Sequence, residues 1–221
     1  MVTSGIGRNN SSEKALARST FYGFLAEVYL RSPDEAGFHR LLSNDIVASL
    51  PDMFGETMNV RRLTYYIERL RSSTNHMKKV ILDYHNLFAV PGTRKKHGDG
   101  TSETTVTVKN PYARVEANFT GASLEFPDQI GVELQFLGFL CGREAKAWKT
   151  GLESRAVKLL GWEAGFIQNH LGPGLPEICS RMNRLARTDF YRGIAAITWD
   201  FVDKDFRVLQ NYLQEQEERV D

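Results

Sequence analysis

The chain has 221 residues, and its 28 lysines and arginines nearly balance its 27 aspartates and glutamates, which leaves a net charge of +1. This length favours one domain with a sizeable core, and the near-neutral charge excludes recruitment of nucleic acid or of a membrane surface by a global field. The N-terminus lacks the apolar core of a signal peptide and no apolar run reaches the ~18 residues of a membrane span, so we expect a cytoplasmic protein without stable membrane insertion.

The N-terminal third has the pattern of amphipathic helices after a polar start. Residues 1–10 are small and polar, which predicts a disordered tail. Ser11 or Ser12 can cap a helix over residues 16–28, where apolar side chains recur at three- and four-residue spacing. The sequence Ser-Pro-Asp-Glu at 32–35 is typical of a second helix start, with proline at the first helical position and glutamate closing a capping box.

Further helices are predicted through residues 60–70 and 77–88. Helical periodicity is lost over 91–127, which predicts a loop or hinge between two lobes. Pro127-Asp128 then opens a helix with Ile130, Leu134, Leu137 and Cys141 on one face. A helix is expected to stop at Gly172-Pro173-Gly174-Leu175-Pro176, and a final helix runs through 190–201. Residues 11–221 therefore predict a single all-α domain of about eight or nine helices.

The sequence shows no carrier for catalysis or metal binding. Neither Cys141 nor Cys179 has the spacing of a disulfide framework or a thiolate metal site, and the five histidines never pair at a four-residue spacing. Gly-x-Ser-x-Gly and phosphate-binding glycine loops are missing from the sequence as well. The sequence therefore gives little support to an enzymatic function, and we predict no cofactor and no metal site, while guanine-nucleotide binding stays open.

Two basic segments have simple explanations. Arg61-Arg62 lies mid-chain on a predicted helix without a long apolar core after it, so it is interpreted as a solvated helix face and not as a twin-arginine signal. Arg94-Lys95-Lys96-His97 falls in the predicted loop of a near-neutral chain, which favours a role in solubility over nucleic-acid binding. We expect no nucleic acid among the partners.

The segment from Tyr84 to Gly92 is the strongest candidate for a binding site. Tyr84, Leu87 and Phe88 share one helical face, and Pro91-Gly92 follows directly. Ordinary core packing and helix termination explain this pattern. A helix end with an aromatic cluster beside a long polar loop can also form an adaptable apolar groove. Such a groove suits a signal peptide.

Carboxylates after the loop admit the same two interpretations. Asp128 and Glu133 fall near the positive end of a predicted helix, where acidic residues commonly satisfy the helix dipole. Carboxylates beside an apolar groove can also bind paired arginines of a signal peptide, with Glu116 and Glu125 adding to the acidic rim.

Residues in a fixed order along the chain carry a resemblance to a known family. They are Tyr84-x-x-Leu87-Phe88 with Pro91-Gly92, Pro111-Tyr112-Ala113-Arg114-Val115, Pro127-Asp128 with Gly131-Val132-Glu133-Leu134, and Phe166-x-x-x-His170-Leu171 with Pro176 and Phe190-Tyr191-x-x-x-Ala195. The chain resembles the TorD/DmsD/NarJ family of redox-enzyme maturation chaperones. Gln129 stands where the family usually has histidine, which weakens any role that needs a titratable imidazole.

The resemblance implies a helical, TorD-like chaperone in the cytoplasm that is not an enzyme. Its partner is expected to be the apo catalytic subunit of a molybdenum oxidoreductase, with or without its N-terminal twin-arginine leader, held until cofactor insertion is complete. Family members exchange halves across a hinge, so monomer and dimer both stay open. A generic helical adaptor that binds a folded partner without a leader is the alternative. The implied client-binding residues are Tyr84, Leu87, Phe88, Pro91, Gly92, Pro111, Tyr112, Asp128, Gln129 and Glu133.

Overall fold

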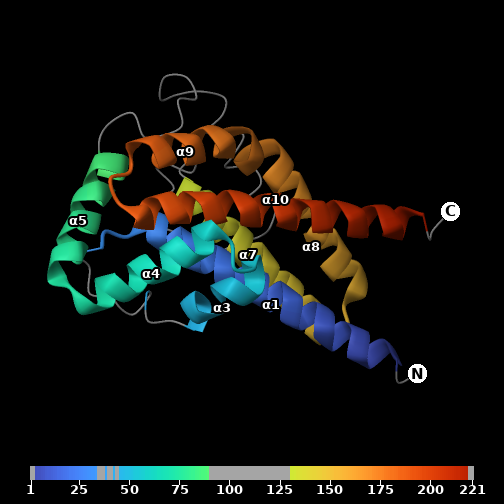
Figure 1. Ribbon diagram of the computed structural model, residues 1–221. Coiled ribbons are helices and arrows are strands. Elements are labelled where there is room, and N and C mark those ends of the chain that lie inside the picture. Colours follow the sequence, from blue (N-terminus) through green and yellow to red (C-terminus); the bar gives the residue numbers. More distant parts are fainter. Residues whose placement is uncertain (1–2, 34–37, 39–41, 43–44, 90–129, 219–221) are drawn as a thin grey trace.

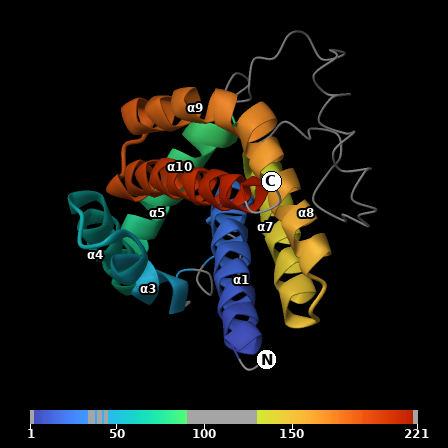
Figure 2. The same cartoon turned by 90° about the vertical axis from the view of Figure 1, so that its right-hand side faces the viewer.

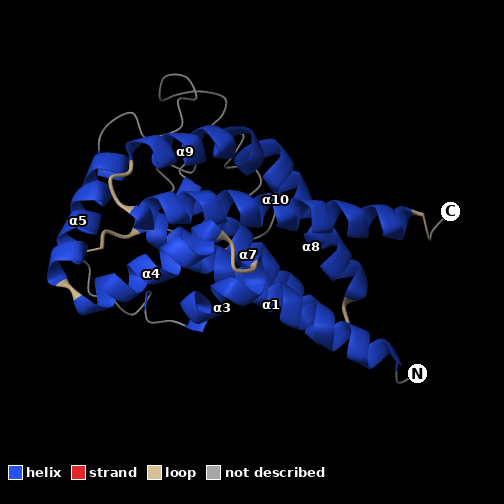
Figure 3. Ribbon diagram, viewed as in Figure 1, coloured by secondary structure: helices blue, strands red, loops and turns tan. Residues whose placement is uncertain are grey.

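The regular structure is helical throughout the described residues, which are 3–33, 38, 42, 45–89 and 130–218 of a computed structural model (Figures 1 and 3). The all-α prediction is therefore confirmed for this part of the chain. The helices are α1 (Thr3–Leu30), α3 (Asp45–Phe54), α4 (Met58–Ser72), α5 (Thr74–Tyr84), α7 (Ile130–Lys149), α8 (Glu153–Phe166), α9 (Gly172–Leu185) and α10 (Asp189–Glu217), with π-helical turns η1 (His85–Ala89) and η2 (Ile167–Leu171).

Helices α1 and α7 form an antiparallel pair with very close backbones. The Ser19 hydroxyl donates to the Gly138 carbonyl at 2.7 Å, and the Ser12 hydroxyl donates to the Ala145 carbonyl at 3.0 Å. A Cβ atom on Gly138 would lie 3.2 Å from the Ser19 carbonyl oxygen and 3.3 Å from the Gly23 nitrogen. Glycine at 138 therefore lets the two helices approach each other.

The start of α1 differs from the sequence prediction. The helix begins at Thr3, so the part of the expected disordered tail from Thr3 to Asn10 is helical. Ser12 does not cap the helix, because its hydroxyl bonds across to α7. Extending an existing helix costs far less than starting one, since each added residue gains a hydrogen bond without a new nucleus. The packed α1 can thus continue into a sequence with weak helical preference.

The glycine- and proline-rich segment after α8 bends the chain without stopping the helix, which corrects the predicted stop. The amide of Gly172 donates to the carbonyl of Ile167, a π-type bond over five residues. Pro173 lies in the first turn of α9, where a missing N–H leaves no helical bond unmade. Helix α8 therefore turns through η2 into α9, as the upper right of Figure 1 shows. π-turns and prolines are the usual causes of such bends.

Helix α10 is the longest helix in the described part of the chain, and it is flanked by α4, α8 and α9 (Figure 2). The α4 face predicted to be apolar is buried, through Val60, Leu63, Ile67 and Leu70. A Cβ atom on Gly193 would lie 2.8 Å from the Leu63 Cβ, so glycine permits the close contact between α10 and α4.

Buried Asp83 joins α5 to the start of α10. Its carboxylate accepts hydrogen bonds from the amides of Arg187 and Thr188, at 2.9 and 2.8 Å, and from the Thr188 hydroxyl at 2.6 Å. These donors belong to the turn before α10, whose amides lack helical partners. An acidic side chain of one helix thus caps another.

The predicted face of α7 is confirmed, because Ile130, Leu134, Leu137 and Cys141 are all buried. The predicted loop or hinge at 91–127 lies outside the described residues. Among the helices that the structure describes, none is both long enough and apolar enough to span a membrane.

Candidate functional site

The predicted aromatic site lies at the end of α5 and mostly faces the core. Tyr84 and Phe88 are half-buried, with ring centroids 5.1 Å apart, and the Phe88 ring lies 5.6 Å from that of Tyr191 and 5.8 Å from that of Tyr29. Leu87 is only 2% exposed. Leu87 therefore belongs to the core, while Tyr84 and Phe88 keep part of their surface accessible.

A π-turn over His85–Ala89 gives this segment its geometry. The extra residue in such a turn rotates the side chains that follow it relative to those of a regular α-helix. Tyr84 donates from its hydroxyl to the Leu30 carbonyl at 3.2 Å, which ties the turn to the end of α1. The Tyr191 hydroxyl, beneath the cluster, is buried and has no hydrogen-bond partner among the described residues. Burial raises the pKa of Tyr191 well above its ordinary value, so this phenol is neutral.

Of the other predicted site residues, only Glu133 lies in the part of the chain that the structure describes. Pro91, Gly92, Pro111, Tyr112, Asp128 and Gln129 lie outside the described residues, as do Glu116 and Glu125. Glu133 lies in the first turn of α7 and is 1% exposed. Its burial argues against the role of an exposed rim carboxylate, because an incoming arginine would have to lose its own hydration to reach it.

A pocket of about 430 Å³ lies elsewhere, between α4, α9 and α10. Polar side chains on its walls include Arg62, Arg192 and Asp189, and Trp199 adds an indole that is 39% exposed. The full lining is Asn59, Arg62, Pro176, Cys179, Ser180, Asn183, Asp189, Arg192, Gly193, Ala195, Ala196 and Trp199. Burial raises the pKa of the Cys179 thiol to about 12, so this side chain contributes a neutral surface and not a nucleophile.

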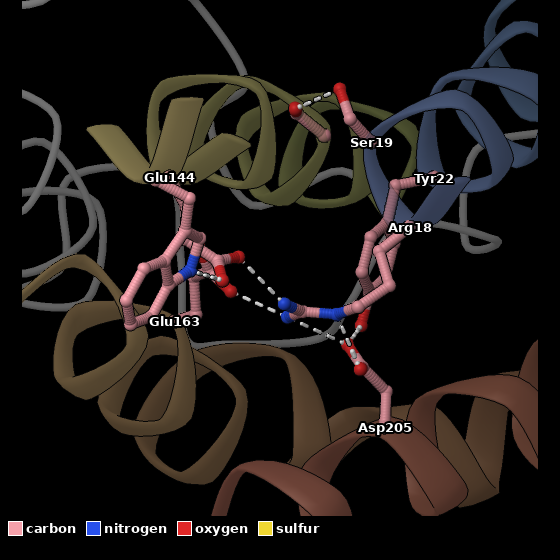
Figure 4. Close-up of polar contacts among 8 residues, drawn as sticks. Arg18, Ser19, Tyr22, Glu144, Glu163 and Asp205 are labelled. Atoms are coloured by element: carbon pink, nitrogen blue, oxygen red, sulfur yellow. Dashed lines mark hydrogen bonds and ion pairs between the residues drawn. The ribbon is translucent and has the colours of Figure 1, made fainter. Parts of the chain in front are cut away.

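A second polar group of residues lies inside the bundle, where α1, α7, α8 and α10 meet (Figure 4). The Arg18 guanidinium donates to Glu144 Oε2 at 2.8 Å and to Glu163 Oε2, and its Nε lies 2.6 Å from Asp205 Oδ1. Tyr22 donates to the same Asp205 at 2.7 Å. We name Arg18, Glu144, Glu163 and Asp205 the Arg18 cluster.

The Arg18 cluster holds one cation among three carboxyl groups. Burial raises the pKa of Glu163 to about 8, because removal from water disfavours its charged form more than Arg18 favours it. Burial also raises the pKa of Glu144, which accepts a hydrogen bond from the Trp148 indole at 2.8 Å. At neutral pH Glu163 is therefore mostly protonated, and the excess negative charge in the core is smaller than the formal count suggests.

Cys141, Glu144 and Glu163 place possible metal-ligand atoms within 4.8 Å of one another. A metal ion there would compete with Arg18, which already bonds both glutamates. Burial raises the pKa of the Cys141 thiol well above its ordinary value, which opposes the thiolate that a metal needs. We therefore assign the Arg18 cluster to the stability of the bundle and not to chemistry.

Comparison with known proteins decides the family. A model of the nitrate reductase delta subunit family matches residues 58–180, more than half of the chain. The chain belongs to the nitrate reductase delta subunit family. This is a family of molybdoenzyme maturation chaperones of the TorD/DmsD/NarJ type, which confirms the resemblance drawn from the sequence. No curated protein matches the chain.

The matched region of this delta-subunit-type chain runs from the start of α4 into α9. It contains the aromatic turn at Tyr84–Phe88 and one wall of the pocket, which includes Asn59 and Arg62. The sequence interpretation treated Arg62 as a solvated helix face and did not single out Trp199. Because three helices contribute to the pocket lining, no local sequence pattern could have identified the pocket.

Proposed function

We propose that this protein binds the apo catalytic subunit of a nitrate-reductase-like molybdoenzyme in the cytoplasm and holds it until the molybdenum cofactor is inserted. The family match over residues 58–180 is the observation that carries this proposal, because the family serves that class of client. Binding withdraws the client from competing fates by mass action. Nothing in this role requires a catalytic group on the chaperone.

We further propose that the N-terminal leader of the client contacts the half-buried faces of Tyr84 and Phe88. Support comes from their position at the end of a helix, where the aromatic rings combine an apolar face with partial accessibility. Leu87 supports the turn from within the core, and Pro91, Gly92, Pro111, Tyr112, Asp128 and Gln129 stay in the proposed contact region.

Titration of a synthetic client leader into the purified protein tests this proposal. We expect Tyr84→Ala and Phe88→Ala to weaken leader binding while the melting temperature falls only moderately, since both side chains are half-buried. Leu87→Glu should instead unfold the protein, because it places a charge at a site that is 2% exposed. It therefore controls for loss of fold.

A leader that does not bind at tens of micromolar would favour the generic adaptor. A pull-down from the native host, followed by identification of the bound large subunit, tests the client itself. Recovery of a partner without a molybdopterin fold would rule the chaperone proposal out.

A further inference from the structure

The pocket between α4, α9 and α10 has the residues of a protein contact. Trp199 forms one wall with a large exposed apolar surface, and Pro176, Cys179 and Ala196 add smaller apolar surfaces. Arg62 and Arg192 lie on the same lining. Tryptophan and arginine are the residue types that most often dominate the binding energy of protein interfaces.

The charge of this region is positive although the whole chain is nearly neutral. Arg192 shares its charge with Asp189, whose Oδ1 lies 3.3 Å away, and both side chains are about half exposed. Arg62 has no ion pair among the described residues. On α4, Arg61 is already paired with Glu56 at 2.6 Å and Arg69 is opposed by Glu68, while α9 adds Arg181 and Arg184 against Glu177. This excess attracts acidic groups.

The lining also limits the kind of anion that fits. Nucleic acids and other polyphosphates are held by several cations at once, whereas this lining offers only Arg62 and an Arg192 that already pairs with Asp189. A peptide carboxylate needs only one arginine, which can bind it in a bidentate manner. Asn59, Ser180 and Asn183 supply hydrogen-bonding groups for a peptide backbone.

We propose that this pocket binds an acidic segment of the mature catalytic subunit, with an apolar side chain of that segment against Trp199 and its carboxylates on Arg62 and Arg192. The inference rests on the proposed client and adds a second contact to it. A leader with paired arginines would be repelled here, so the two contacts take different parts of the client.

The two proposed contacts both adjoin the first turns of α10. Tyr191 lies 5.6 Å from Phe88 in the aromatic cluster, while the next residue, Arg192, lines the pocket. Two linked contacts raise the overall affinity, since the second is made within a complex that already exists. The chaperone would then hold a subunit by its leader and by its folded part together.

The test compares three probes in binding titrations: the apo catalytic subunit of the host's nitrate-reductase-like molybdoenzyme, the same subunit without its leader, and the leader peptide alone. In the protein, Arg62→Glu combined with Arg192→Glu is compared with a control of equal charge, Arg155→Glu combined with Arg207→Glu. Arg155 and Arg207 are exposed on α8 and α10 and are not part of the pocket lining.

We expect the pocket variant to bind the leaderless subunit at least about tenfold more weakly, since each arginine loses an attraction and gains a repulsion. Its affinity for the leader peptide should not fall, and the control variant should bind every probe as the wild type does. Raising the ionic strength should weaken the wild-type complex with the leaderless subunit. Trp199→Ala should weaken the same complex without removing its salt dependence.

Equal binding of the leaderless subunit by the pocket and control variants would overturn the inference. Displacement of the leaderless subunit by inorganic phosphate would also overturn it, because the pocket would then prefer a free anion to an acidic segment. Failure of the wild type to bind the leaderless subunit while it binds the full-length subunit would also overturn it, and leave the proposed function intact. If the wild type binds none of the three probes, the proposed function itself fails.

Discussion

Arg18, Glu144, Glu163 and Asp205 each occupy a core-facing position in a different helix. Arg18 lies between buried Ala15 and Tyr22, at the spacing where an apolar residue is expected. The signal in the sequence is thus a charged residue that interrupts an apolar stripe. One basic and three acidic interruptions indicate a buried ionic cluster, which single-helix reasoning had passed over.

The raised pKa of Glu163 gives stability a defined pH dependence. The ordinary pKa of Glu163 is 4.5, and in the folded protein it is about 8. Between these two pH values, Glu163 is protonated in the folded protein and ionised in the unfolded chain. Protonated Glu163 contributes fully to stability below this pH interval. As the pH rises through the interval, the contribution falls by at most about 1.4 kcal/mol per pH unit, and above the interval it is lost. We expect Glu163→Gln to remove this slope in chemical denaturation at pH 5 to 8.

Asp205→Asn is the variant to compare with Glu163→Gln, because Asp205 accepts hydrogen bonds from both Arg18 and Tyr22. We expect it to destabilise the fold by about 3 kcal/mol at neutral pH, since it leaves the arginine poorly compensated. Glu163→Gln should cost less than this at pH 7, because glutamine resembles the protonated acid. Equal losses in the two variants would show that Glu163 is ionised in the folded protein.

Asp83 offers a second test at the residue scale. Asp83→Asn should lower the free energy of unfolding by about 1–3 kcal/mol, because an amide places its own donor against amides that need an acceptor. Asp203→Asn, which removes only the partly exposed pair with Arg207, should change stability by less than about 0.5 kcal/mol. Urea unfolding curves of the two variants measure the difference.

At the scale of elements, the bend between α8 and α9 depends on the backbone at Gly172. A Cβ atom there would lie 2.7 Å from the carbonyl oxygen of Ile167, and backbone cannot move aside as a flexible side chain can. We expect Gly172→Ala to destabilise the protein by about 1–3 kcal/mol.

Gly161→Ala in α8 is the control for this element. No atom lies within 4 Å of the added Cβ, and alanine is preferred within helices, so a gain of about 0.5–1 kcal/mol is expected. Thermal melts of both variants would reveal opposite shifts. A neutral Gly172→Ala would mean that the π-turn can relax into a regular helix.

At the scale of the whole molecule, a helical bundle without strands in the described residues predicts a circular dichroism spectrum dominated by helix. The apolar periodicity in the sequence makes the same prediction. A spectrum dominated by strand would contradict both.

The sequence by itself determined the helical class, the buried faces of α4 and α7 and the family. Those features depend on local periodicity and on short groups of residues in a fixed order, and both can be recognised without knowledge of distant contacts. The start of α1 and the continuity from α8 to α9 were predicted wrongly, because α1 propagates beyond its packed part and a π-turn accommodates the prolines at the start of α9.

Only the tertiary structure decided which side chains are accessible. Leu87 and Glu133 lie within the core, and Arg62 and Trp199 share a pocket, although the sequence treats each as a position on one helix. The Arg18 cluster likewise forms only where helices far apart in the sequence meet. Burial, ion pairing and pocket shape are properties of surfaces brought together by folding, so the pattern of a single segment cannot contain them.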